Sequence, residues 1–171
     1  MVTETDKLVL EFFLGLARSQ PEDLSIDDIL RFTEKKVEKC HCFIQWIFPM
    51  MEPSQHNSSA PQISGGFKEL FLENTKAQES FCKSCRKYLN FIGFECVLGE
   101  ISILTTENAK MFYDRQNHNR LRITRVLNSL NQIGKTECSK NIFSKLKRIY
   151  SENPCRIPKD SFEYWAKTQR L

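Results

Sequence analysis

Hydrophobic residues in this 171-residue chain recur mostly at intervals of three and four, the spacing of one helix face. The first such stripe is followed by a polar break at 20–23. Ser25 and Asp28 then form a capping-box pattern, which predicts a short helix that ends near Phe32. The first stripe consists of Leu8, Val9, Phe12, Phe13 and Leu16.

The next predicted helix is apolar on two faces. It begins at Thr33, a favourable N-cap residue, and ends at Pro49, which cannot continue a helix. Because both faces are apolar, we expect this helix in the middle of the fold. One face carries Val37, Cys40, Ile44 and Ile47, and the other carries Cys42, Phe43 and Trp46.

The remainder of the chain alternates between loops and helical patterns. Residues 49–66 contain proline, serine and glycine without any hydrophobic period, which predicts a long loop. A weak alternation near 96–104 indicates a minor hairpin. These patterns together predict an all-α fold of about six to eight helices, in one compact domain over 1–171. Helices are predicted at 67–72, 75–92, 106–116, 119–133, 136–150 and 160–165.

Composition places the chain among globular proteins rather than disordered or membrane-spanning ones. It is 40% hydrophobic and 27% charged, and its formal net charge is +4. No apolar run is long enough to cross a bilayer, so we expect no transmembrane segment. The basic excess is small, so specific nucleic-acid binding is not expected.

Seven cysteines and an acidic N-terminus indicate a reducing compartment and no signal peptide. We therefore expect a cytoplasmic or nuclear protein, with non-classical export as the alternative. Cys40-His41-Cys42 and Cys82-x-x-Cys85 offer enough ligands for zinc, but apolar helix stripes also account for these cysteines. We favour buried thiols, with no metal and no cofactor.

His41 and Gln45 form a polar pair on the predicted central helix. At positions i and i+4 they line one edge, beside Trp46. A buried imidazole and amide need partners, which an internal polar network would supply. The alternative is that these three residues form the edge of a ligand pocket.

The segment from His118 to Arg125 carries three arginines in the first two turns of a helix. Cations there oppose the positive end of the helix dipole, at about 0.3–1 kcal/mol each. Internal ion pairs could offset this cost, and their acids would be Asp27, Asp28 or Glu52. Alternatively, an anion such as a phosphate or carboxylate binds there. Its ligands would be Arg122, Arg125, His118 and Asn119.

Two segments of the chain resemble the signature blocks of the opioid growth factor receptor conserved region. The first runs HCFIQWIFP from His41 to Pro49 and is followed by Glu52 and Pro53. The second runs HNRLRITRVLNSL from His118 to Leu130. Weaker similarity extends over nearly the whole chain.

The resemblance implies a binding role. Named members of the family are described as perinuclear or nuclear receptors for an enkephalin pentapeptide, and similar domains stand alone in bacterial proteins of unknown role. A peptide ends in a carboxylate, which would suit an arginine pair. We therefore favour a module that binds a peptide or protein segment, with its oligomeric state open and no catalytic residue assigned.

Two alternatives to this function remain. One is an enzyme acting on phosphate-bearing or nucleotide-like substrates, with His41 or His118 as acid or base. We favour a non-enzyme, because no paired carboxylate or obvious nucleophile accompanies these histidines. The other is a purely structural interaction domain, in which both signature blocks are core.

Overall fold

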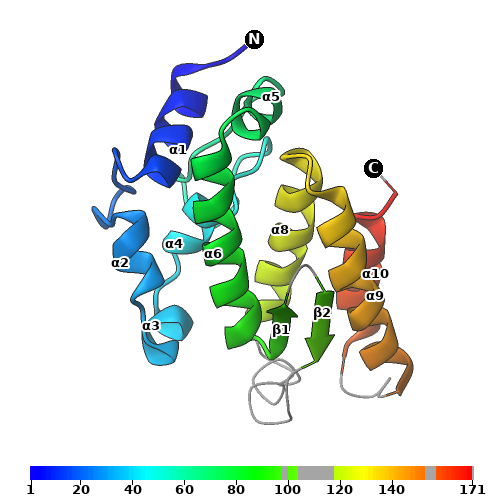
Figure 1. The fold of residues 1–171 in the computed structure, drawn as a ribbon. Helices are drawn as coiled ribbons and strands as arrows, with labels where there is room; N and C mark the ends of the chain where they lie inside the picture. Colours follow the sequence, from blue (N-terminus) through cyan, green and yellow to red (C-terminus); the bar gives the residue numbers. More distant parts are fainter. Residues whose placement is uncertain (98–99, 104–117, 153–156, 171) are drawn as a thin grey trace. The chain divides into compact units, whose positions relative to one another are not determined.

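The all-α class is confirmed by the computed structural model, which describes residues 1–97, 100–103, 118–152 and 157–170. Helices account for most of this part of the chain, together with one short hairpin (Figure 1). The predicted helix at 106–116 lies outside the described residues.

The chain divides into two compact units. Unit 1 comprises Met1–Tyr88 and Gln132–Gly134, and unit 2 comprises Leu89–Asn131 and Lys135–Leu171. The grouping of all residues into one domain stays a prediction, so each unit is described by itself.

Unit 1 contains six helical segments, counted over the described residues, and the last of them continues into unit 2. The segments are α1 (Glu4–Leu14), α2 (Ile26–Leu30), α3 (Glu34–Lys39), α4 (Phe43–Ile47), α5 (Phe67–Leu72) and α6 (Thr75–Phe91).

The first helix begins four residues before the hydrophobic stripe that predicted it. Thr3 and Asp6 form a capping box: the Asp6 backbone N–H donates to Thr3 Oγ1 and the Thr3 N–H donates to Asp6. Gly15 ends the helix at φ 77°, a left-handed conformation that favours glycine. The Thr-x-x-Asp spacing in the sequence indicates this helix N-terminus, although the hydrophobic stripe alone did not.

The prediction of one helix from Thr33 to Pro49 is wrong, because the chain breaks between α3 and α4. Cys40 is extended, at φ −83° and ψ 128°. One end of the buried Gln45 amide lies 2.9 Å from the His41 carbonyl oxygen and 2.7 Å from that of Cys42, so it must be the donating nitrogen. A side chain that binds these carbonyls competes with helical hydrogen bonding and favours the break.

Helix α4 lies in the core of unit 1, as predicted for this segment. Every residue from Phe43 to Pro49 is buried. The Trp46 ring lies 5.2 Å from the Phe12 ring, and the Phe48 ring lies 5.9 Å from the Phe81 ring in a T-shaped arrangement. Such edge contacts add to the burial of large apolar surfaces, so the aromatic residues of several helices together build this core.

Residues 49–66 carry no helix and are held by hydrogen bonds at their far end. The Ser64 backbone N–H and hydroxyl both donate to the Asp6 carboxylate, at 2.7 and 2.6 Å. The Ile63 N–H donates to the Met50 carbonyl at 3.0 Å. The capping carboxylate of α1 therefore also anchors the long loop.

Unit 2 contains an antiparallel hairpin and three further helices in its described part. Phe94 pairs with Ile103, and the strands lie where the sequence predicted them. Strand β2 packs against α9 (Figure 1). The elements are β1 (Phe94–Val97), β2 (Glu100–Ile103), α8 (Asn119–Gln132, with its last residue in unit 1), α9 (Thr136–Glu152) and α10 (Lys159–Lys167).

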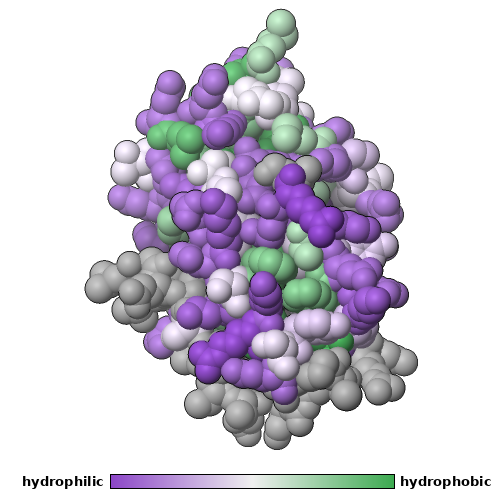
Figure 2. Space-filling model, turned by 90° about the vertical axis from the view of Figure 1, so that its right-hand side faces the viewer, coloured by the Kyte–Doolittle hydropathy of each residue, from purple (hydrophilic) through white to green (hydrophobic). Residues whose placement is uncertain are grey.

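Ring stacking holds α10 on α9. The Phe162 ring lies 4.1 Å from that of Tyr150, nearly parallel to it, and 5.8 Å from that of Phe143. The face that carries α9 and α10 is mostly hydrophilic, with hydrophobic residues in a few small groups (Figure 2). Among the described residues, no helix combines the length and apolarity that crossing a membrane requires.

Candidate functional site

The arginine-rich start of α8 is packed inside unit 2. Arg122 is 5% exposed, and its Nη1 donates to Oδ1 of Asn119 at 3.3 Å. Asn119 is itself buried and is the first residue of α8. His118 and Arg125 are half-buried. Arg122 and Asn119 therefore contribute to the packed interior of unit 2.

The backbone of the same turn is also engaged. Trp165, fully buried on α10, donates from Nε1 to the Arg120 carbonyl at 3.2 Å. Two of the acids considered as ion-pair partners for these arginines have contacts elsewhere. Asp28 lies 3.2 Å from Arg18, and Glu52 accepts a hydrogen bond from the Gln132 amide at 2.7 Å.

The structure separates the predicted polar edge of His41, Gln45 and Trp46. His41 is exposed in the link between α3 and α4, so it does not share a helix with Gln45. Gln45 and Trp46 are buried, and both donate to backbone carbonyls of surface segments. These two side chains therefore brace loops from inside unit 1.

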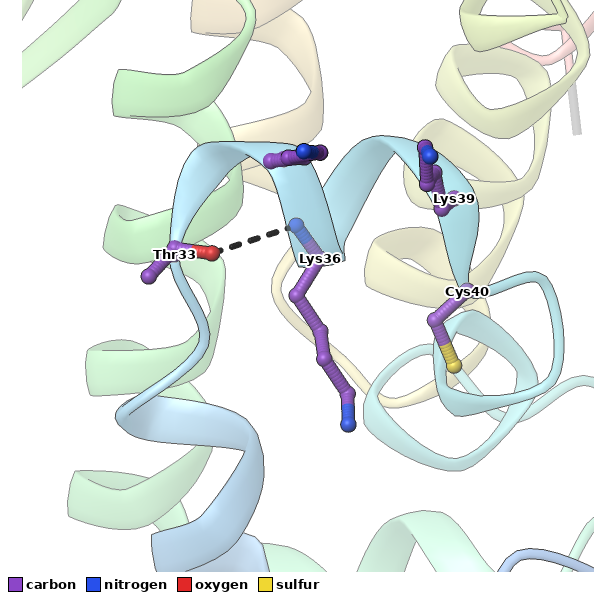
Figure 3. Close-up of a pocket in the computed structure, with 5 residues that line it drawn as sticks. Thr33, Lys36, Lys39 and Cys40 are labelled. Atoms are coloured by element: carbon purple, nitrogen blue, oxygen red, sulfur yellow. Dashed lines mark hydrogen bonds between the residues drawn. The ribbon is translucent and has the colours of Figure 1, made fainter.

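One of the braced segments borders a basic hollow of about 420 Å³ on α3. This "lysine hollow" is shown in Figure 3, where the Lys36 and Cys40 side chains point to the same side of α3. The Lys36 backbone N–H donates to Thr33 Oγ1 at 3.3 Å, which caps the helix. The lining residues are Thr33, Lys35, Lys36, Lys39 and Cys40.

Positive charge extends from the lysine hollow toward α6. The Lys36 ammonium lies 5.0 Å from the centre of the Phe32 ring, a cation–π contact. Lys87, on α6, donates from Nζ to the Phe32 carbonyl at 2.7 Å. Two ammonium groups thus converge on one buried residue, which makes this side of unit 1 favourable for an anionic group.

A second hollow, of about 520 Å³, lies at the turn between α1 and α2. We call it the turn hollow. Trp46 Nε1 donates to the Gln20 carbonyl at 3.1 Å, so the core helix α4 braces this turn as well. The hollow is lined by Leu8, Arg18, Ser19, Gln20, Pro21, Asp23 and Ser59.

Cys42, which precedes α4, has a strongly raised pKa. The Cys42 thiol hydrogen bonds to the Glu22 carboxylate. This bond, together with burial and the nearby negative charge, raises the pKa of Cys42 from 9.0 to about 11. Cys42 is therefore protonated at neutral pH and is a poor metal ligand or nucleophile there.

No group of three or more metal-ligating side chains is assembled in the part of the chain that the structure describes. Cys40, Cys42, Cys82, Cys85 and Cys138 carry thiols. Cys85 is buried on α6, as its apolar stripe predicted, whereas Cys82 is exposed. Sequence reasoning missed the lysine hollow, although three lysines within five residues of the predicted helix were a visible signal.

Comparison with known proteins identifies the family. The model of the opioid growth factor receptor (OGFr) conserved region matches residues 2–170. The chain is 29% identical over 131 residues to the opioid growth factor receptor-like protein 1 of Xenopus tropicalis, which covers 73% of this chain and 25% of that protein. It is 31% identical over 134 residues to the human opioid growth factor receptor, which covers 73% of this chain and 19% of that protein.

A third relative is the opioid growth factor receptor of Rattus norvegicus, 30% identical over 136 residues, with 75% of this chain and 23% of that protein covered. The chain thus spans about a quarter or less of the length of these curated relatives. No solved structure matches it. The family match covers nearly every residue and includes both signature blocks, so the chain belongs to the opioid growth factor receptor conserved-region family.

Proposed function

We propose that this chain is a binding module for a peptide or protein segment, and that the lysine hollow receives an acidic group of that segment. The observation that carries the proposal is the placement of Lys35, Lys36 and Lys39 around one hollow of about 420 Å³. Clustered ammonium groups attract carboxylates and raise the rate of association. One relative is named as a receptor and another as a receptor-like protein, which is consistent with a ligand-binding domain.

Exposure favours the lysine hollow over the start of α8 as the first point of contact. Lys35, Lys36 and Lys39 are exposed, so an acidic group reaches them without any rearrangement. Arg122, by contrast, is 5% exposed. A carboxylate-binding role for Arg122, Arg125, His118 and Asn119 stays a prediction, as does a location in the cytoplasm or nucleus.

The expected affinity is modest and sensitive to salt. Each exposed ion pair contributes about 0.2–1 kcal/mol. Screening shortens the Debye length from about 30 Å at 0.01 M ionic strength to about 10 Å at 0.1 M. Apolar contacts outside the lysine hollow must therefore supply part of the affinity for a peptide.

The test is fluorescence anisotropy with a labelled glutamate-rich peptide and a glutamine counterpart of the same length. We expect the acidic peptide to bind more tightly, and the difference to shrink between about 0.01 and 0.1 M salt. The double variant Lys35→Glu, Lys39→Glu should weaken binding about tenfold or more, since both lysines change sign.

The matched control is Lys76→Glu, Lys147→Glu, which makes the same change in net charge at two exposed lysines outside the hollow. This control should keep the affinity within about twofold. Equal loss in both double variants would show that only net charge matters and would refute the proposed site. Equal binding of the two peptides would refute the proposed ligand chemistry.

A further inference from the structure

The turn hollow has a prearranged wall. The Ser19 N–H donates to the Leu24 carbonyl at 2.7 Å, and the Leu24 N–H donates back to Ser19 Oγ at 3.2 Å. From the core side, Trp46 holds the Gln20 carbonyl. A wall fixed in this way loses little conformational freedom when a ligand binds.

Acidic residues outnumber basic ones in the segment that contains the turn. Residues 18–31 contain four acidic and two basic residues. Arg18 lies 3.0 Å from the Asp23 carboxylate and 3.2 Å from that of Asp28, so one guanidinium faces two carboxylates. The Asp23 side chain is 78% exposed. The local excess of negative charge is complementary to a cation.

The other lining groups suit a peptide rather than a bare ion. Leu8, 38% exposed, and the Pro21 ring supply apolar surface. Ser19 is 1% exposed, and its oxygen already accepts from Leu24. Among the described residues nothing accepts the Ser19 hydroxyl proton, which is therefore available to a carbonyl oxygen of a ligand.

We propose that the turn hollow is a second binding site, which takes an arginine or lysine side chain of a protein segment together with the apolar residue beside it. Asp23 pairs with the cationic head, Leu8 and Pro21 contact the apolar residue, and Ser19 donates to the segment's backbone. The volume of about 520 Å³ falls in the range of small-ligand pockets. This site shares no lining residue with the lysine hollow, and its exposed charged group for a ligand is a carboxylate rather than an ammonium.

The two tryptophans provide a direct readout, because Trp46 contacts the turn whereas Trp165 lies in unit 2. In ¹H–¹⁵N spectra of the whole chain, N-acetyl-leucyl-arginine amide should shift the Trp46 indole signal and leave that of Trp165 in place. The citrulline analogue has the same shape without the charge, and it should bind about two- to fivefold more weakly. A glutamate analogue should not bind.

Two substitutions make the test specific. Asp23→Asn keeps an acceptor for Arg18 and tolerates the left-handed backbone of this residue (φ 53°), so it removes only the charge. It should abolish the preference for arginine over citrulline. Ser59→Phe fills the hollow from its rim and should abolish binding of both peptides.

The proposal is overturned if arginine and citrulline peptides bind equally to the unaltered chain, or if neither substitution changes binding. It is also overturned if Trp165 responds as strongly as Trp46, since that pattern indicates non-specific association. The Lys35→Glu, Lys39→Glu variant should bind the arginine peptide within about twofold of the unaltered chain. Failure of the lysine hollow and failure of the turn hollow are therefore distinguishable.

Discussion

The two signature segments, α4 in unit 1 and the start of α8 in unit 2, use buried polar side chains in opposite ways. On α4, Trp46 donates to Gln20, which lines the turn hollow, and Gln45 donates to the backbone that directly follows Cys40 of the lysine hollow. On α8, Arg122 donates to Asn119 within its own helix. The first segment shapes surfaces, whereas the second consolidates an interior.

A polar residue in a signature block therefore need not touch a ligand. Gln45 and Trp46 would affect binding through the loops they hold, and their own side chains are 7% and 2% exposed. The exposed lysines that we propose as ligand contacts, such as Lys39, lie outside the block. Substitutions in α8 should therefore change stability, and substitutions of exposed lysines on α3 should change binding.

The largest expected effect is the loss of stability in Arg122→Ala. The substitution removes a nearly buried guanidinium and leaves the buried Asn119 oxygen without this donor. Hydrogen bonds to charged groups contribute about 1.5–3 kcal/mol, and we expect a decrease of this size in the free energy of unfolding. Urea denaturation followed by circular dichroism measures it.

The control for this prediction is Lys39→Ala on the exposed side of α3. Surface substitutions of this kind usually change stability by less than about 0.5 kcal/mol. Lys39→Ala should therefore weaken binding of the acidic peptide while leaving the midpoint of urea denaturation nearly unchanged. An Arg122→Ala chain as stable as the unaltered one would contradict the interior role of α8.

Local patterns predicted much of the fold because they depend on neighbouring residues. The predicted capping box of Ser25 and Asp28 is present. Gly93 follows α6 in a left-handed conformation, a local signal of the same kind. Helix α6 is capped by Asn74, whose Oδ1 accepts from the Ala77 N–H, although the neighbouring Thr75 is also a favourable cap residue. Asparagine and threonine compete closely as caps, so neighbouring candidates are hard to rank.

Features that depend on distant residues could not be predicted in the same way. The break at Cys40–Cys42 requires the Gln45 amide to turn back onto the chain, which the helical periodicity of the segment conceals. The turn hollow requires Leu8, Pro21 and Ser59 to meet, although they lie far apart in sequence. The spacing of hydrophobic residues along one helix carries no information about tertiary contacts between distant segments.

A smaller effect is expected from the carboxylate that anchors the long loop of unit 1. Burial by itself would raise the pKa of Asp6, but hydrogen bonds from Ser64 and Thr3 outweigh it and hold the pKa below the ordinary 3.8. The stabilisation is therefore complete above about pH 4 and is lost as the pH falls through the lowered pKa.

Asp6→Asn should reduce stability by about 1–2 kcal/mol at neutral pH, and the difference from the unaltered chain should shrink below about pH 4. Urea midpoints between about pH 2 and pH 6 measure this convergence. Asp27→Asn, at an exposed aspartate of α2, is the matched control and should leave the midpoints nearly unchanged. A difference that stays constant with pH would show that Asp6 acts through packing rather than charge.

Glu22→Gln should have the smallest effect on stability. Its main effect should be on the reactivity of Cys42, the residue that precedes α4. The hydrogen bond from Cys42 to Glu22 is the largest cause of the high thiol pKa of about 11. Removing the carboxylate should lower this pKa. The thiolate fraction at neutral pH should then rise about tenfold for each unit by which the pKa falls. Alkylation of Cys42 by iodoacetamide, followed by mass spectrometry, should accelerate accordingly, while exposed Cys82 reacts at its former rate. Unchanged Cys42 reactivity would mean that burial alone protects the thiol, and that the turn is held by Trp46 without help from this bond.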